Sequence, residues 1–187
     1  MLRSNLNRRS VIFVRVAALA LALTASAAVL RAAESLRITP LSTNGKVFVT
    51  FELSDAYSPA IRDAIASGLK TTFTYELELR VVGSGWMDRT IATTVVSSTD
   101  QYDNLTRRHT LTRTVDGRVE EVVVTDDEAT VKAWLTTWAR VPLCDTSKLD
   151  QTRDYYVRVN ARTRPSGSSL LGWTNSITGR AKFTFVP

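Results

Sequence analysis

The chain alternates apolar and polar residues with a period of two over several long stretches, which is typical of half-buried β-strands. Residues 47–53 show this pattern, since every odd position there is apolar. The apolar face of the clearest stretch, 71–81, consists of Phe73, Tyr75, Leu77, Leu79 and Val81. Strands that bury one face and expose the other are typical of antiparallel sheets. We therefore expect a mainly antiparallel β fold.

A short helix is predicted between these two strands. Ser58 offers a side-chain oxygen to the free backbone N–H groups of a helix start, and Pro59 follows where its missing N–H costs nothing. Gly68 can adopt the left-handed conformation that ends a helix. The stop signals predict a helix of about ten residues that packs on one face or edge of the sheet.

The other strands are predicted from weaker alternation and from turn signals. Asn44-Gly45 and Asp116-Gly117 are residue pairs that favour tight hairpin turns. Residues 97–103 are polar and predict a turn. The further strands that we expect are 36–39, 89–96, 105–114, 118–124, 155–162 and 181–185.

A second helix is predicted directly after residue 124. Thr125 and Glu128 fit a capping box, in which the hydroxyl and the carboxylate each satisfy a backbone donor at the helix start. Apolar residues, two tryptophans among them, recur on one face as far as Val141, and Pro142 stops the pattern. The sequence thus predicts an α+β fold, mainly antiparallel, with a sandwich-like sheet arrangement of about eight strands and two short helices.

The N-terminal segment 1–27 has the features of an export signal. Arginines precede or enter an apolar run from Val16 to Leu23, and Ala25-Ser26-Ala27 provides a small-x-small cleavage pattern. The alternative is an uncleaved membrane anchor, because residues 11–30 are about as long as a bilayer-spanning helix. We expect residues 28–187 to form a single exported domain, either periplasmic or anchored in the inner membrane and facing the periplasm.

Removing this segment changes how the charge of the chain is interpreted. The formal net charge of +6 falls to +2, because residues 1–27 hold four of the 24 basic residues and none of the 18 acidic ones. The calculated pI of about 9.8 therefore does not indicate a nucleic-acid partner.

Several short motifs in the chain resemble a bacterial exported family that is catalogued as a domain of unknown function, number 4390. The motifs that carry the resemblance are Phe51-x-Leu53-Ser54, Ser67-Gly68-Leu69, Tyr75-x-Leu77-x-Leu79-Arg80, Trp86-Met87-Asp88 and Tyr102-Asp103-x-Leu105-Thr106. They are mainly hydrophobic and structural. The resemblance implies export and a single domain, and it implies no catalytic residues.

The residues that carry catalytic or metal chemistry are sparse. His109 is the only histidine and Cys144 the only cysteine, so an intramolecular disulfide and a zinc site of several His and Cys ligands are excluded. No Gly-x-Ser-x-Gly motif accompanies His109. The acidic run 126–128 is explained by helix capping and lacks the alternating ligands of a calcium loop. We therefore expect no enzymatic activity, no metal and no cofactor.

Two groups of residues are candidates for binding. Arg107, Arg108 and Arg113 lie on a predicted strand pair, where they form either a solvated face or a contact patch for an acidic partner or anionic headgroups. Trp86 and Trp173 lie beside glycines in predicted loops, although aromatic residues more often belong to the core.

These observations favour a non-enzymatic interaction module of the bacterial envelope that engages another envelope protein. The alternative is a carrier of a hydrophobic small molecule or lipid, in which the sheet and the second helix enclose a cavity. A hydrolase is the third hypothesis.

We predict that the exported protein begins at Ala28, because signal peptidase cleaves after a small-x-small sequence. N-terminal sequencing of the protein purified from the envelope fraction tests this. A chain that keeps residues 11–30 would instead show that the segment is an anchor.

Overall fold

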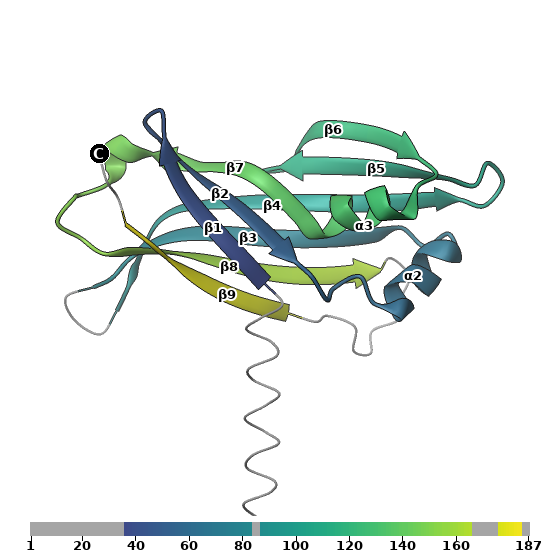
Figure 1. Ribbon diagram of the computed structural model, residues 1–187, viewed down its shortest axis with the longest axis horizontal. Helices are drawn as coiled ribbons and strands as arrows, with labels where there is room; N and C mark the ends of the chain where they lie inside the picture. Colours follow the sequence, from purple (N-terminus) through teal and green to yellow (C-terminus); the bar gives the residue numbers. More distant parts are fainter. Residues whose placement is uncertain (1–35, 84–86, 166–175, 185–187) are drawn as a thin grey trace, which may run out of the picture. The chain divides into compact units, whose positions relative to one another are not determined.

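Two antiparallel sheets make up most of the computed structural model, which describes residues 36–83, 87–165 and 176–184 (Figure 1). The small sheet has the order β1-β2-β7 and contains β1 (Leu36–Thr43), β2 (Lys46–Leu53) and β7 (Thr137–Asp145). The large sheet has the order β6-β5-β4-β3-β8-β9 and contains β3 (Thr71–Val81), β4 (Arg89–Asp103), β5 (Arg108–Val115), β6 (Arg118–Thr125), β8 (Tyr155–Pro165) and β9 (Ser176–Phe183).

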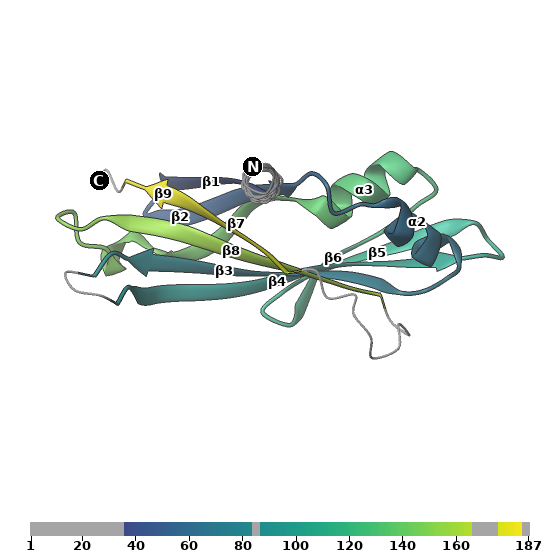
Figure 2. The ribbon, with the colours of Figure 1, turned by 90° about the horizontal axis from the view of Figure 1, so that it is seen from below.

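The small sheet and two helices lie together on one face of the large sheet (Figure 2). The helices are α2 (Pro59–Ala66) and α3 (Glu128–Thr136), and a short 3₁₀ turn, η1 (Thr146–Lys148), follows β7. This arrangement confirms the predicted α+β, sandwich-like, mainly antiparallel fold, with nine strands in the described residues where about eight were expected. The core lies between the two layers, where the inward residues of β2 and β3 are buried.

Tyr75 lies at the centre of this core and connects both layers. Its ring centroid is 4.7 Å from that of Phe51 in the small sheet and 6.5 Å from that of Phe73 in its own strand. Its hydroxyl donates a hydrogen bond of 2.6 Å to the backbone carbonyl of Leu135 in α3. Burial raises the pKa of the Tyr75 hydroxyl, so this group stays a donor.

The predicted hairpin turns between β1 and β2 and between β5 and β6 are confirmed, and so is the predicted helix cap between β2 and α2. Asn44-Gly45 and Asp116-Gly117 have positive φ angles at both residues, as a two-residue hairpin turn requires. The Ser58 side chain accepts a bond from the N–H of Ile61 at the start of α2. Gly68 follows the helix with φ 82°.

The turn predicted at residues 97–103 is wrong, because β4 continues through this segment as far as Asp103. Its backbone pairs with β3 as far as Asp100 and with β5 as far as Asp103. The inward positions Ser98 and Asp100 are fully buried although they are polar. Polar residues on the buried face hide the alternation that marks a strand.

The second helix is shorter than predicted, since it ends at Thr136 and β7 begins at the next residue. Trp138 and Val141 are buried in a strand that pairs with β2, and Pro142 lies in this edge strand, where a missing N–H is tolerated. A bulge at Arg140, with φ 53°, shifts the register and lets a helix-like spacing of apolar residues fit a strand.

The start of α3 also differs from the predicted capping box. Asp127, not Thr125, is the N-cap, and its carboxylate accepts bonds from the N–H groups of Ala129 and Thr130. The Thr125 hydroxyl accepts from the N–H of Asp127 instead, at 3.1 Å. These bonds lower the pKa of the Asp127 carboxyl, first through the Thr130 hydroxyl and then through the two N–H groups.

Several predictions fall outside the described residues. They concern the export signal at 1–27, Trp86, Trp173 and the end of the last predicted strand. Within the part of the chain that the structure describes, neither helix is long and apolar enough to cross a membrane.

We predict that Tyr75→Phe lowers the free energy of unfolding by about 1 to 3 kcal/mol, because the buried Leu135 carbonyl loses its partner. Urea denaturation measures the change. Tyr102→Phe is the matched control, since the described residues give its hydroxyl no hydrogen-bond partner, and an equal loss in both variants would contradict the role of the Tyr75 bond.

Candidate functional site

The connection between β4 and β5 is a tightly bonded loop. The carboxylate of Asp103 accepts bonds from the N–H of Leu105 at 2.8 Å and from the hydroxyl of Thr106 at 2.9 Å. The N–H of Arg107 donates to the backbone carbonyl of Asp103 at 2.8 Å. These side-chain bonds lower the pKa of the Asp103 carboxyl. The loop is therefore held in one conformation by its own hydrogen bonds.

The exposed side chains of this loop include Leu105, which is 95% exposed although it is apolar. Arg107 has a positive φ of 56°, a conformation that costs a non-glycine residue about 1 kcal/mol. Arg108, at the start of β5, is also exposed. Within the described residues neither arginine makes an ion pair, so both guanidinium groups are open to a ligand.

His109 lies on the inward face of β5 and is held by a buried carboxylate. Its Nδ1 is 2.9 Å from Oδ2 of Asp100, a residue of the neighbouring strand β4 that is completely buried. The ring of Tyr102 lies 4.6 Å from the imidazole, centroid to centroid. Burial raises the pKa of the Asp100 carboxyl, and the hydrogen bond with His109 offsets part of this rise.

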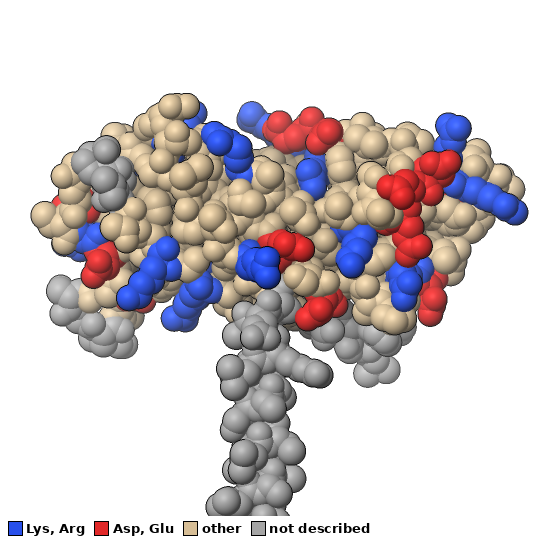
Figure 3. All heavy atoms as spheres, in the orientation of Figure 1, with Lys and Arg blue, Asp and Glu red and all other residues tan. Residues whose placement is uncertain are grey.

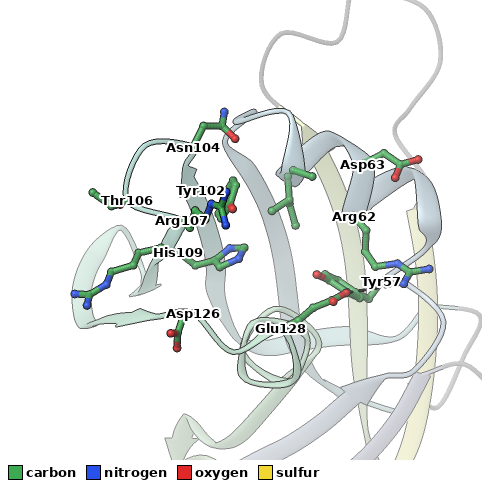
Figure 4. Close-up of a pocket in the computed structure, with 13 residues that line it drawn as sticks. Tyr57, Arg62, Asp63, Tyr102, Asn104, Thr106, Arg107, His109, Asp126 and Glu128 are labelled. Carbon is green, nitrogen blue, oxygen red and sulfur yellow. Dashed lines mark ion pairs between the residues drawn. The ribbon is translucent and has the colours of Figure 1, made fainter.

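This pair lies in an open cleft of about 1000 Å³ between the β4–β5 loop, α2 and the start of α3 (Figure 4). We call Arg107, Arg108 and His109 the hairpin wall, and Asp126 and Glu128 the helix wall. Figure 4 shows Asp126 below Arg107 and His109, and Glu128 farther across, near Tyr57 and Arg62. The two walls therefore carry opposite charge. The lining residues from α2 and the segment before it are Tyr57, Arg62, Asp63, Ile65 and Ala66.

Tyr57 and Arg62 complete the third side of the cleft. Burial and the nearby charges of Glu128 and Asp100 raise the pKa of Tyr57 to about 12, so its hydroxyl stays protonated. Arg62 contacts Glu128 at 3.9 Å, and both side chains are at least half exposed. An exposed ion pair of this length adds little to stability.

Arg113 does not belong to the exposed arginine patch that the sequence suggested. Its guanidinium lies over the rings of Trp134 and Trp138, 4.2 and 4.7 Å from their centroids. The same group donates to the backbone carbonyls of Trp134 at 3.1 Å and Thr137 at 2.6 Å. Because β5 alternates, Arg113 shares the inward face with His109, and it caps the C-terminal end of α3.

The arrangement in the cleft is suited to binding charged groups. The imidazole presents Nε2 to a ligand because Nδ1 is engaged by Asp100. Within the described ranges, no group of three or more His, Cys, Asp or Glu residues is placed to hold a metal ion. Cys144 is half-buried in β7 of the small sheet, and burial raises the pKa of its thiol.

Sequence reasoning named Arg107 and Arg108, which line the cleft, but it missed Asp100 as the partner of His109. The missing signal is the spacing of Ser98, Asp100 and Tyr102, which continues the inward positions of β4. A strand that runs on to Asp103 brings Tyr102 opposite His109 and Asp100 opposite Leu111. The other two candidates, Trp86 and Trp173, are not described by the structure.

A family model described as Domain of unknown function (DUF4390) matches residues 31–170, well over half of the chain. The chain belongs to the DUF4390 family. The DUF4390 match includes every residue that lines the cleft and ends before β9. No curated protein and no solved structure gives a significant match.

We predict that the neutral imidazole of His109 carries its proton on Nδ1, because Asp100 accepts from that nitrogen. Since the chain has a single histidine, ¹⁵N NMR of the untagged protein reports on this ring alone. In Asp100→Ala the proton should move to Nε2. An Nε2–H tautomer in the unmodified protein would contradict the pairing.

Proposed function

We propose that this domain is a non-enzymatic binding module for another protein of the bacterial envelope, and that the β4–β5 loop and the cleft beside it form the contact surface. The observation that carries the proposal is the fully exposed Leu105 on a loop whose backbone is fixed by Asp103. An apolar side chain held out in water contributes nothing to folding. It gains free energy when a partner covers it.

The fixed conformation of the loop favours binding. A preorganised loop loses little conformational entropy when a partner binds, so more of the contact energy remains as affinity. Arg107 supports the same conclusion, because glycine would adopt its φ without strain. Backbone strain is often stored at functional positions, and here it occurs in the loop that carries Leu105.

The surface charge supports a protein partner. Figure 3 shows acidic and basic side chains next to one another at the end of the sheets that carries the β4–β5 loop. A protein surface of mixed charge complements this pattern, whereas nucleic acid binds to a continuous basic surface.

The envelope location rests on the sequence. The features of an export signal in residues 1–27 and the low net charge of the remaining chain support it. The carrier of a hydrophobic molecule stays a prediction, and lipid extraction of the purified protein tests it.

We predict that a photo-crosslinking amino acid at position 105 gives one discrete adduct in living cells, because the partner covers this side chain. The same amino acid at position 119 is the control, since Val119 is 62% exposed and lies in β6, away from the β4–β5 loop. The control should give no such adduct. The measurement is the mass of the crosslinked product, followed by its identification.

Identical adducts at both positions, or no adduct at position 105, would contradict the proposed surface. Circular dichroism of the two proteins checks that each is folded. Leu105→Asn should then abolish co-purification of the identified partner, whereas Val119→Asn should leave it unchanged.

A further inference from the structure

The hairpin wall and the helix wall leave their charges largely unpaired. Within the described residues, Arg107, Arg108 and Asp126 make no ion pair, and Glu128 makes only the long contact with Arg62. The walls thus do not neutralise each other across the cleft. Elsewhere in the same protein, charges do pair closely, since Glu78 accepts from Arg80 at 3.1 Å and from Arg158 at 2.7 Å.

The backbone of each wall is held by hydrogen bonds that do not involve a ligand. The hairpin wall is fixed by the bonds of Asp103 and by the pair of Asp100 with His109. The helix wall is fixed by the cap of Asp127, whose own N–H is bonded to Thr125. Two walls of opposite charge on fixed backbone segments favour a ligand whose charges have matching positions.

The floor between the walls is partly apolar. Tyr57, Ile65 and Tyr102 line the cleft, and aromatic rings can pack against the aliphatic part of a long side chain. The imidazole of His109 is only 12% exposed, and its Nε2 is the polar atom left for a ligand. A charged side chain with an aliphatic stem fits these surroundings.

We propose that the cleft binds a segment of the partner protein that carries one acidic and one basic side chain. The carboxylate lies at the hairpin wall, where the guanidinium of Arg107 donates hydrogen bonds to it. The ammonium or guanidinium lies at the helix wall against Asp126. This inference rests on the proposed function and names the chemistry of the partner.

The test uses short peptides in place of the unidentified partner. A set of acetylated, amidated peptides carries Glu and Lys separated by no, one, two or three alanines, and the tightest is selected by ¹⁵N NMR titration at about 50 mM salt, where screening is weak. Replacing its Glu by Gln, or its Lys by Gln, should each weaken binding about fivefold.

Two protein variants assign each charge to its wall. With Arg107→Gly, the Glu peptide and its Glu-to-Gln version should bind with equal affinity. The peptide with Lys should still bind more tightly than its Lys-to-Gln version. Glycine is safe at this position because φ is positive. With Asp126→Asn, replacing the Lys of the peptide should no longer change its affinity, whereas replacing the Glu should still weaken binding. Arg118→Gln is the matched control, because Arg118 is an exposed arginine at the start of β6 and lines no part of the cleft.

Three results would overturn the inference. They are the absence of binding by any peptide, equal binding of the charged and the neutral peptides, and equal effects of Arg107→Gly and Arg118→Gln. Each leaves the crosslink at position 105 as a separate test of the proposed function. Peptide binding with the expected pattern but no crosslink would instead support the charge selectivity and contradict Leu105 as part of the contact surface.

Discussion

The C-terminal end of α3 depends on two side chains of the large sheet. The last carbonyls of a helix have no partner within it, and here they are buried between the layers. Tyr75 bonds to the carbonyl of Leu135, and Arg113 bonds to those of Trp134 and Thr137. Because a buried carbonyl without a partner is costly, these bonds fix where α3 ends. Because α3 is a short helix, the bonds at its C-terminal end also set where its first residues lie beside the cleft.

The sequence predicts the parts of this fold in which local pattern and tertiary environment agree. Strand β3 alternates apolar and polar residues because one of its faces is buried, and Asn44-Gly45 turns because both residues adopt positive φ. The sequence predictions fail where pairing with a distant strand decides whether a segment is helix or strand. Residues after Thr136 extend because β2 offers backbone partners, and a bulge at Arg140 accommodates a spacing that also fits a helix.

The candidate site was predictable only in part. Arg107 and Arg108 are adjacent in the sequence and near a turn, so exposure is their ordinary state. Arg113 has the same chemistry, but its side chain faces inward because of its parity on β5. The pair of Asp100 with His109 joins residues nine positions apart, and it requires the register of β4 against β5. Register is a property of the whole sheet, and a local pattern does not contain it.

The junction of α3 and β7 has a mechanical consequence. Thr136 ends the helix and Thr137 begins the strand, so no loop separates the two elements. A loop can absorb a movement of the helix, whereas a direct junction leaves no flexible segment between helix and strand. The end of α3 is therefore tied directly to a strand that pairs with β2 in the small sheet.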